Sequence, residues 1–327
     1  LEDRVFAALK MWLKREVEAG SATGIEHWLA ARMALREGLP TEALDMVTSR
    51  SAGNTPVIAY ERAIALSKAG RAPEAIPILH VLLAEQPTDV SIRLTLAEQN
   101  LAVGDSFEAT EVLQPLEVEH LAPAERQKLC ELALEAALRN GNAAQVLDTW
   151  VDLATAASFG DLQVMGDIVL RSLTVDKLAA ELVALVDRRI ADPAEWPLLL
   201  LRARISAANG LHGQEMEFYA RYLENDWDSV QMLRFVAELA TQYATLPVRL
   251  DTKTRDGQVT GTAVRAVDYS GTELATRVYR RLIELQPMIP DNYAALMRIL
   301  QVRGEVETAK KVALELADRN TSSAQVQ

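Results

Sequence analysis

The side chains that could carry catalysis or bind a metal ion are few and widely separated in this chain. Its histidines are His27, His80, His120 and His212, and its single cysteine is Cys130. No two of them have the short spacing that places two metal ligands on one helix face or in one loop. We therefore predict no metal and no cofactor, and the apolar neighbours of Cys130 indicate a small core side chain instead of a nucleophile.

Loops that bind phosphate or calcium are not recognisable either. The glycines are spread along the chain, without a Walker-type loop or a dinucleotide-binding cluster. Asp251–Gly257 begins like a calcium loop, but Lys253 and Arg255 stand where oxygen ligands would be required. We predict that the protein is not an enzyme.

Composition and charge indicate a helical, soluble protein. Of the 327 residues 49% are hydrophobic but only 5% are aromatic. Abundant Ala and Leu with few aromatic residues favour closely packed helices and argue against an all-β fold. The net charge of −12 repels polyphosphate, so we predict no nucleic-acid partner.

The sequence contains no transmembrane segment, because no apolar run approaches the roughly 18 residues that a spanning helix needs. It begins at Leu1, directly within an apolar helical pattern, and we interpret it as a fragment or a processed chain. A signal peptide or membrane anchor could precede Leu1. The compartment, cytoplasmic or periplasmic, is therefore left open.

A period near 34 residues organises the chain. Apolar-periodic segments end at regularly spaced glycines, and an alanine follows several of these glycines five residues later. Glycine permits the left-handed backbone of a turn, and alanine lets two helices approach closely. The pattern predicts a series of helical hairpins. The residues are Gly38, Gly70, Gly104, Gly141, Gly210 and Gly304, with Ala43, Ala75, Ala109 and Ala309; Ala275 lies 34 residues before Ala309, in the same register.

Prolines complete the pattern at Pro87, Pro193 and Pro287, where each would end a second helix. Together these residues resemble the tetratricopeptide repeat (TPR) family, in particular bacterial TPR proteins, with its 34-residue unit. Units 56–89 and 90–126 match best, whereas 162–195 lacks the turn glycine. The resemblance implies an all-α fold, a right-handed α-solenoid of about eight helical hairpins in one domain.

We expect that domain to cover 1–327, in five parts: an N-terminal helix or cap at 1–23, repeats at 24–246, an insertion at 247–270, C-terminal repeats at 271–320, and a polar tail at 321–327. The insertion differs in character, because Val248 and Leu250 alternate with polar residues before Asp256-Gly257. Such alternation is typical of a β-hairpin, and a plain surface loop is the alternative.

In the TPR family the first helices of successive hairpins line a concave groove that meets ligands. The register of this chain then implies three groups of groove residues. The N-terminal group combines aromatic and basic side chains suited to an acidic or carboxylate-bearing peptide, and the middle group is acidic. Ordinary solvated helix faces would explain the same charges without a ligand. The three groups are Trp28, Arg32, Arg36, Tyr60 and Lys68; Glu98, Glu131 and Glu135; and Arg204, Arg234, Glu238 and Arg298.

The resulting hypothesis is a non-enzymatic scaffold that binds a protein or an extended peptide along the groove. By analogy with bacterial TPR proteins, it would serve in an envelope, secretion or polysaccharide-export assembly. One alternative is a regulatory sensor of a small peptide or signalling molecule. Another is the recruiting region of a larger enzyme. Self-association into a homo-oligomer is left open.

Overall fold

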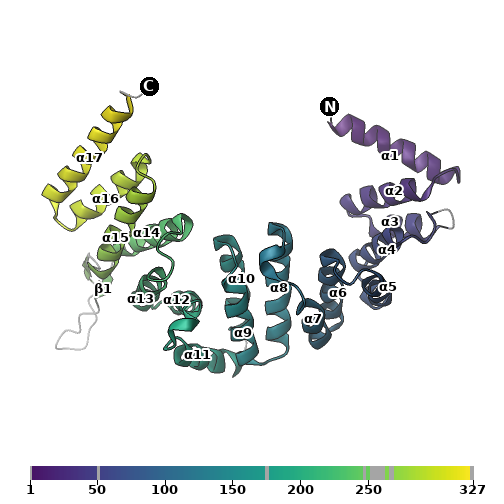
Figure 1. The fold of residues 1–327 in the computed structure, drawn as a ribbon, viewed down its shortest axis with the longest axis horizontal. Coiled ribbons are helices and arrows are strands. Elements are labelled where there is room, and N and C mark those ends of the chain that lie inside the picture. The colour runs from purple at the N-terminus through teal and green to yellow at the C-terminus, as the bar shows by residue number, and fades with distance from the viewer. Residues whose placement is uncertain are drawn as a thin grey trace. The chain divides into compact units, whose positions relative to one another are not determined.

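The computed structural model describes residues 2–49, 52–173, 177–245, 248–250, 262–264 and 269–324. These residues form α-helices and one short two-stranded sheet (Figure 1). The chain divides into two compact units, Leu1–Ala157 and Ser158–Gln327. The expectation of one continuous domain over 1–327 stays a prediction.

The first unit begins with a single helix, which is followed by four helical hairpins. In each hairpin the two helices pack together, and the first helices of successive hairpins also pack on one another. A short 3-10 turn, Val118–His120, leads into the last hairpin. The helices are α1 (Glu2–Glu18), α2 (Gly24–Arg36), α3 (Pro40–Thr48), α4 (Pro56–Lys68), α5 (Ala72–Glu85), α6 (Val90–Val103), α7 (Ser106–Leu113), α8 (Pro123–Arg139) and α9 (Ala143–Ala154).

The second unit contains eight helices within its described residues. Those from α12 onward pair as hairpins, whereas α10 and α11 pack mainly against α12 instead of on each other. The sequence lacks a turn glycine for this pair, and its connection, 174–176, lies outside the described residues. The helices are α10 (Phe159–Ser172), α11 (Lys177–Arg189), α12 (Leu198–Ala208), α13 (His212–Leu223), α14 (Val230–Thr245), α15 (Tyr269–Leu285), α16 (Pro290–Val302) and α17 (Val306–Ala324), with a 3-10 turn at Pro193–Glu195.

The insertion contains the predicted β-hairpin strands. Strand β1 (Val248–Leu250) pairs antiparallel with β2 (Thr262–Val264), so that Val248 lies opposite Val264. The turn predicted at Asp256-Gly257 lies outside the described residues. Helices α14 and α15, on either side of the insertion, still pack together as one hairpin.

Two boundaries differ from the sequence prediction. Helix α8 begins at Pro123, within the predicted unit 90–126 and not after it, because proline is favourable in the first turn of a helix. Helix α17 continues through Ala324, so the stretch expected as a tail from 321 is helical at its start. Adding residues to an existing helix avoids the free-energy cost of starting a new one. An ion pair between Arg319 and Glu315 (2.9 Å) also stabilises the last turns of α17.

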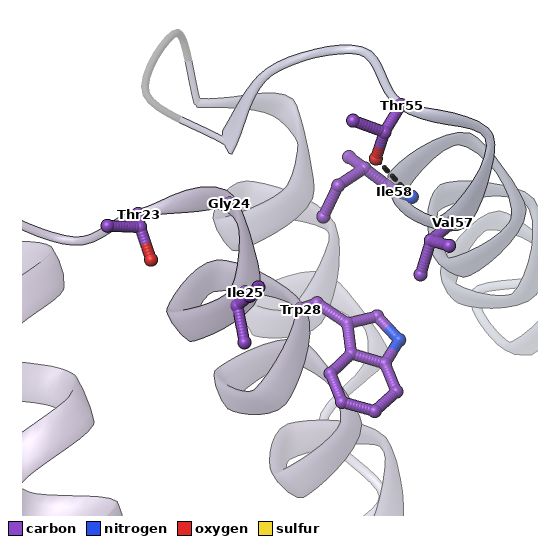
Figure 2. A pocket seen from close by; sticks show the side chains of 7 residues that line it. All are labelled: Thr23, Gly24, Ile25, Trp28, Thr55, Val57 and Ile58. Carbon is purple, nitrogen blue, oxygen red and sulfur yellow. Dashed lines mark hydrogen bonds between the residues drawn. The ribbon is translucent and has the colours of Figure 1, made fainter.

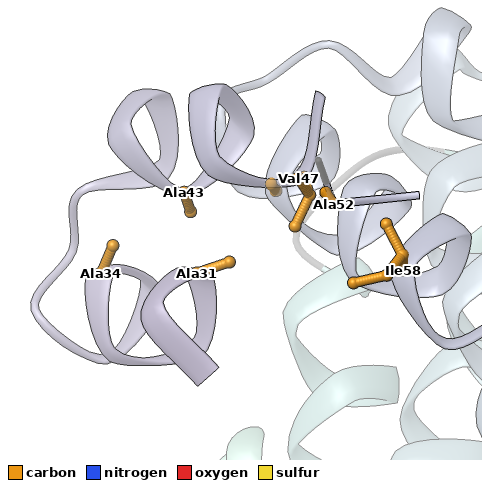
Figure 3. Packing of buried hydrophobic residues seen from close by; sticks show 7 residues of the cluster. Ala31, Ala34, Ala43, Val47, Ala52 and Ile58 are labelled. Carbon is orange, nitrogen blue, oxygen red and sulfur yellow. The ribbon is translucent and has the colours of Figure 1, made fainter. Parts of the chain in front are cut away.

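The predicted glycines and alanines occupy the turns and close contacts assigned to them. All six turn glycines have positive φ, with a value of 88° at Gly104. The alanines of the pattern are buried, and Figure 3 shows Ala31 and Ala34 of α2 facing Ala43 of α3. Because alanine ends at Cβ, the two helix backbones can approach closely at these positions. The hairpins are therefore TPR-like, as the spacing predicts.

Replacing Gly104 by Ala tests the turn. An L-residue in the left-handed region is strained, so we expect Gly104→Ala to lower the free energy of unfolding by about 1 kcal/mol. Urea unfolding followed by circular dichroism measures this change. In the control Gly213→Ala, a helical glycine with no atom near the new Cβ, stability should be unchanged or slightly higher. Equal effects of both substitutions would contradict the assignment.

Candidate functional site

A pocket of about 790 Å³ opens at the N-terminal ends of α2 and α4 (Figure 2). Ile25 and Val57 are 75% and 57% exposed, although both are apolar. Figure 2 shows Ile25 and Trp28 extending from α2, and Val57 from α4, into this region. Single exposed apolar residues are ordinary, but several that share one pocket indicate a binding surface. The lining residues are Thr23, Gly24, Ile25, Trp28, Thr55, Val57 and Ile58.

The first turns of both helices are held in place by local interactions. At α4 the Thr55 hydroxyl accepts a hydrogen bond from the Ile58 N–H (3.4 Å), and at α2 the Thr23 N–H donates to Glu26 in a capping box. Gly24 permits close approach of the connection between α3 and α4, because a Cβ there would lie 2.9 Å from the Ala52 carbonyl oxygen. These interactions fix the backbone that carries the lining side chains.

A buried carboxylate, Glu61, fixes the wall of this pocket. It is 3% exposed and accepts a hydrogen bond from Trp28 Nε1 (3.1 Å). Arg32 Nε lies 3.3 Å from Glu61 Oε2, and its guanidinium lies over the indole ring of Trp28 at 5.2 Å. Burial raises the pKa of Glu61, an effect that Arg32 and Trp28 partly offset. Glu61 therefore orients both side chains.

Sequence reasoning missed Glu61, although a signal was present. Glu61 lies between Ile58 and Ala65 at helical spacing, on the stripe that α4 buries. A carboxylate on such an apolar stripe must find partners, since an unpaired buried charge is costly. Trp28 and Arg32, which lie one repeat earlier in the sequence, are these partners.

Other predicted residues of the first unit also connect neighbouring helices. The Tyr60 hydroxyl lies 3.0 Å from Thr95 Oγ1 and 3.2 Å from the Ser91 carbonyl oxygen, both on α6. Burial raises the pKa of the Tyr60 phenol. Glu98 of α6 pairs with Lys128 of α8 at 3.0 Å. These contacts tie α4 to α6 and α6 to α8.

The two remaining acidic residues bond within α8, and the two remaining basic residues are exposed. Glu131 accepts a hydrogen bond from Gln127 (2.9 Å), and Glu135 pairs with Arg139. Arg36 and Lys68 lie at the C-terminal ends of α2 and α4, respectively. We call the exposed face that these two helices share the α2–α4 surface; it comprises Ile25, Trp28, Arg32, Arg36, Val57, Tyr60 and Lys68.

In the second unit, Arg204 forms a link between helices. Its guanidinium donates to Gln163 and Asp167 of α10, and its side chain is only 12% exposed. Gly166 makes room for it, because a Cβ at that position would collide with the Arg204 side chain. This arginine thus joins α12 to α10. Its contact with a ligand stays a prediction.

The other predicted residues of the second unit influence the charge of one tyrosine. Burial raises the pKa of Tyr279 on α15, and the charge of Glu238 raises it further, whereas Arg298 and Arg234 lower it. Glu238 and Arg234 lie on α14 and Arg298 on α16, so these three side chains act on the same phenol. Arg234 also donates to Gln286 (3.2 Å). These three residues therefore affect one phenol, whereas Arg204 lies on α12 and interacts with α10.

Neither a metal-binding cluster nor a membrane-spanning helix occurs within the described part of the chain. No group of three or more His, Cys, Asp or Glu side chains there is placed to hold a metal ion. None of the helices there combines the length and the apolar character needed to cross a membrane. Cys130 and His27 are both buried, and the Ser49 hydroxyl lies 3.3 Å from the His27 ring nitrogens.

Comparison with known proteins finds solved structures of low sequence identity. Neither protein-family models nor curated proteins match the chain. The C-terminal part of a TPR repeat-containing protein from Cytophaga hutchinsonii is 13% identical, with a TM-score of 0.40, over 82% of this chain and 99% of that one. The TPR domain of P58(IPK) is 12% identical, with a TM-score of 0.30, over 91% and 84% of the two chains. A human IFIT1 dimer with m7Gppp-AAAA is 14% identical, with a TM-score of 0.27, over 95% and 72%.

Replacing Glu61 by Gln tests the buried carboxylate. Folding raises the pKa of the Glu61 carboxyl above its ordinary value of 4.5. A group of this kind contributes its full stabilisation at pH values below its unfolded-state pKa. That contribution is lost as the pH rises through the folded-state pKa. The stability of Glu61→Gln relative to wild type should therefore increase between about pH 4 and about pH 7, as measured by urea unfolding.

The exposed Glu85 of α5 provides the matched control for this measurement. Glu85→Gln removes a carboxylate of the same type from the surface of the same hairpin. Its stability relative to wild type should change less over the same pH range. A pH dependence as large for Glu85→Gln as for Glu61→Gln would contradict the role of burial.

Proposed function

We propose that this protein is a non-enzymatic scaffold that binds a protein or peptide segment on the α2–α4 surface. The observation that carries the proposal is the exposed apolar pocket whose Trp28 wall is held by buried Glu61. Aromatic side chains are frequent anchors of binding energy at interfaces, since they bury a large area with little loss of rotamer freedom.

The rigidity of the surface supports the same proposal. Ile25 and Val57 lie on capped helices, and Arg32 and Trp28 already have a common partner in Glu61. A partner segment would therefore meet side chains that need little reordering, which lowers the entropic cost of association. The resemblance to TPR proteins adds an expectation of protein partners, and the net charge of −12 disfavours nucleic acid.

The finer role belongs to the same proposal and rests on resemblance alone. It places the scaffold in a bacterial envelope, secretion or polysaccharide-export assembly. A sensor of a small peptide would use the same pocket, and a recruiting region of a larger enzyme would present the same surface. Identification of the partner distinguishes these roles.

Photo-crosslinking from the pocket tests the proposal. Benzoylphenylalanine at position 25, where the native side chain projects into solvent, should crosslink specific proteins in a native lysate. The second substitution Val57→Asp should abolish these crosslinks, because a charge in the apolar pocket opposes burial of an apolar partner. Mass spectrometry identifies the captured proteins, and circular dichroism checks that the fold is retained.

Phe107 provides the matched control, because it is 69% exposed on α7 and does not line the pocket. Benzoylphenylalanine at position 107 reports nonspecific capture, and Phe107→Asp reports the effect of a surface charge. If positions 25 and 107 capture the same proteins, or if Val57→Asp changes nothing, the α2–α4 surface is not the binding site.

A further inference from the structure

A second pocket of the first unit, of about 300 Å³, lies between α7, α8 and α9. Its floor is apolar and buried, and each of these three helices contributes a leucine to it. Among the described residues that line it, none is basic. We call it the α7–α9 pocket; its floor comprises Leu113, Val118, Leu129 and Leu153.

The short helix α7 accounts for the way this pocket is built. Pro115 lies two residues after Leu113, the last residue of α7, and proline cannot continue a helix because it lacks the N–H and its ring clashes with the preceding turn. The chain then passes through the 3-10 turn Val118–His120 before α8 begins at Pro123. This connection therefore adds Val118 to the floor, beside the leucines of the helices.

Two carboxylates stand at the rim of the α7–α9 pocket. Glu111 belongs to α7 and Asp152 to α9, and both residues are exposed. Within the described part of the chain, neither carboxylate has an ion-pair or hydrogen-bond partner. Lys128 of α8, the basic residue next to the floor residue Leu129, pairs with Glu98 of α6 instead. The rim thus carries negative charge above an apolar floor.

The sequence around the pocket is acidic over a long range. Neither Lys nor Arg occurs in 94–125 or in 140–170. These two ranges contain the whole of α7 and the whole of α9. The charges that these two helices contribute at pH 7 are therefore all negative, and a cation is the ligand charge that complements them.

An apolar floor below two carboxylates suits a side chain with an aliphatic stem and a cationic end. Lysine and arginine have this character, because they bury their methylene groups along apolar surface and keep the charge outside. Arginine fits better, since its planar guanidinium presents five N–H donors and can meet two carboxylates at once. Arginine is also enriched at protein interfaces, where lysine is depleted.

We propose that the α7–α9 pocket binds an arginine side chain of a partner protein. The aliphatic stem lies against Leu113 and Leu153, and the guanidinium donates hydrogen bonds to Glu111 and Asp152. The inference does not depend on the proposed function, because none of these residues belongs to α2 or α4. It gives the scaffold a second docking site of different chemistry.

A random peptide library displayed on phage tests the inference, with the full chain as bait. Peptides enriched on the wild type should include a group with arginine at a common position. This group should be lost on Glu111→Gln/Asp152→Asn, and on Thr149→Phe, which fills the pocket without changing its charge. It should persist on Glu85→Gln/Glu224→Gln, which removes the same charge from exposed residues elsewhere. Circular dichroism checks that each variant is folded.

Fluorescence anisotropy of an enriched peptide makes the test quantitative. Replacing its arginine by citrulline, which keeps the shape but loses the charge, should weaken binding to the wild type about tenfold. The same replacement should weaken binding to Glu111→Gln/Asp152→Asn by less than about twofold, because the carboxylates that the charge would meet are gone. Added salt should weaken binding of the arginine peptide more than that of the citrulline peptide.

Several outcomes would overturn the inference. It fails if no arginine-dependent peptide is enriched, or if citrulline weakens binding equally to the wild type and to Glu111→Gln/Asp152→Asn. It also fails if agmatine, a small guanidinium with an alkyl stem, binds as tightly as the peptides, because the site then takes a small cation. Loss of the arginine peptides on Val57→Asp would place their binding on the α2–α4 surface. Negative crosslinking at position 25 would contradict the proposed function and leave this inference standing.

Discussion

The hairpin of α2 and α3 depends on one close contact, in which alanine on one helix faces its partner helix. Ala31 and Ala43, for example, are fully buried between α2 and α3. A larger side chain at such a point would have to be accommodated by separation of the backbones, which would disturb the packing of the next hairpin as well. The turn glycines add a second requirement, because the short connection between the two helices needs a residue with left-handed backbone angles.

Polar contacts then fix successive hairpins relative to one another. Within the first unit, Glu61 joins α4 to α2 and Tyr60 joins α4 to α6, while Arg204 joins α12 to α10 in the second unit. Exposed ion pairs contribute little to stability, typically below about 1 kcal/mol. A buried carboxylate such as Glu61 costs desolvation energy as well. We interpret these contacts as orienting devices, with apolar packing as the main source of stability.

The same contacts shape the surface offered to a partner. Buried Glu61 accepts a hydrogen bond from Trp28 and pairs with Arg32, so the exposed parts of these two side chains keep one arrangement. Ile25 and Val57 beside them stay exposed. The pocket is thus a consequence of how two repeats are joined. A fold built from repeated units acquires a local, specific site where one unit carries a residue that the pattern does not require.

The sequence by itself determined the all-α hairpin architecture, since the period of Gly and Ala reports turns and close contacts that are local along the chain. It also placed aromatic and basic side chains on one face of the predicted helices, and it left the insertion open between a β-hairpin and a loop. The tertiary structure alone decided which of these side chains meet: Glu61 with Trp28 and Arg32, and Arg204 with Asp167 across Gly166. The reason is physical, because a periodic pattern fixes the face on which a residue lies, whereas its partner depends on the distance and rotation between helices about thirty residues apart.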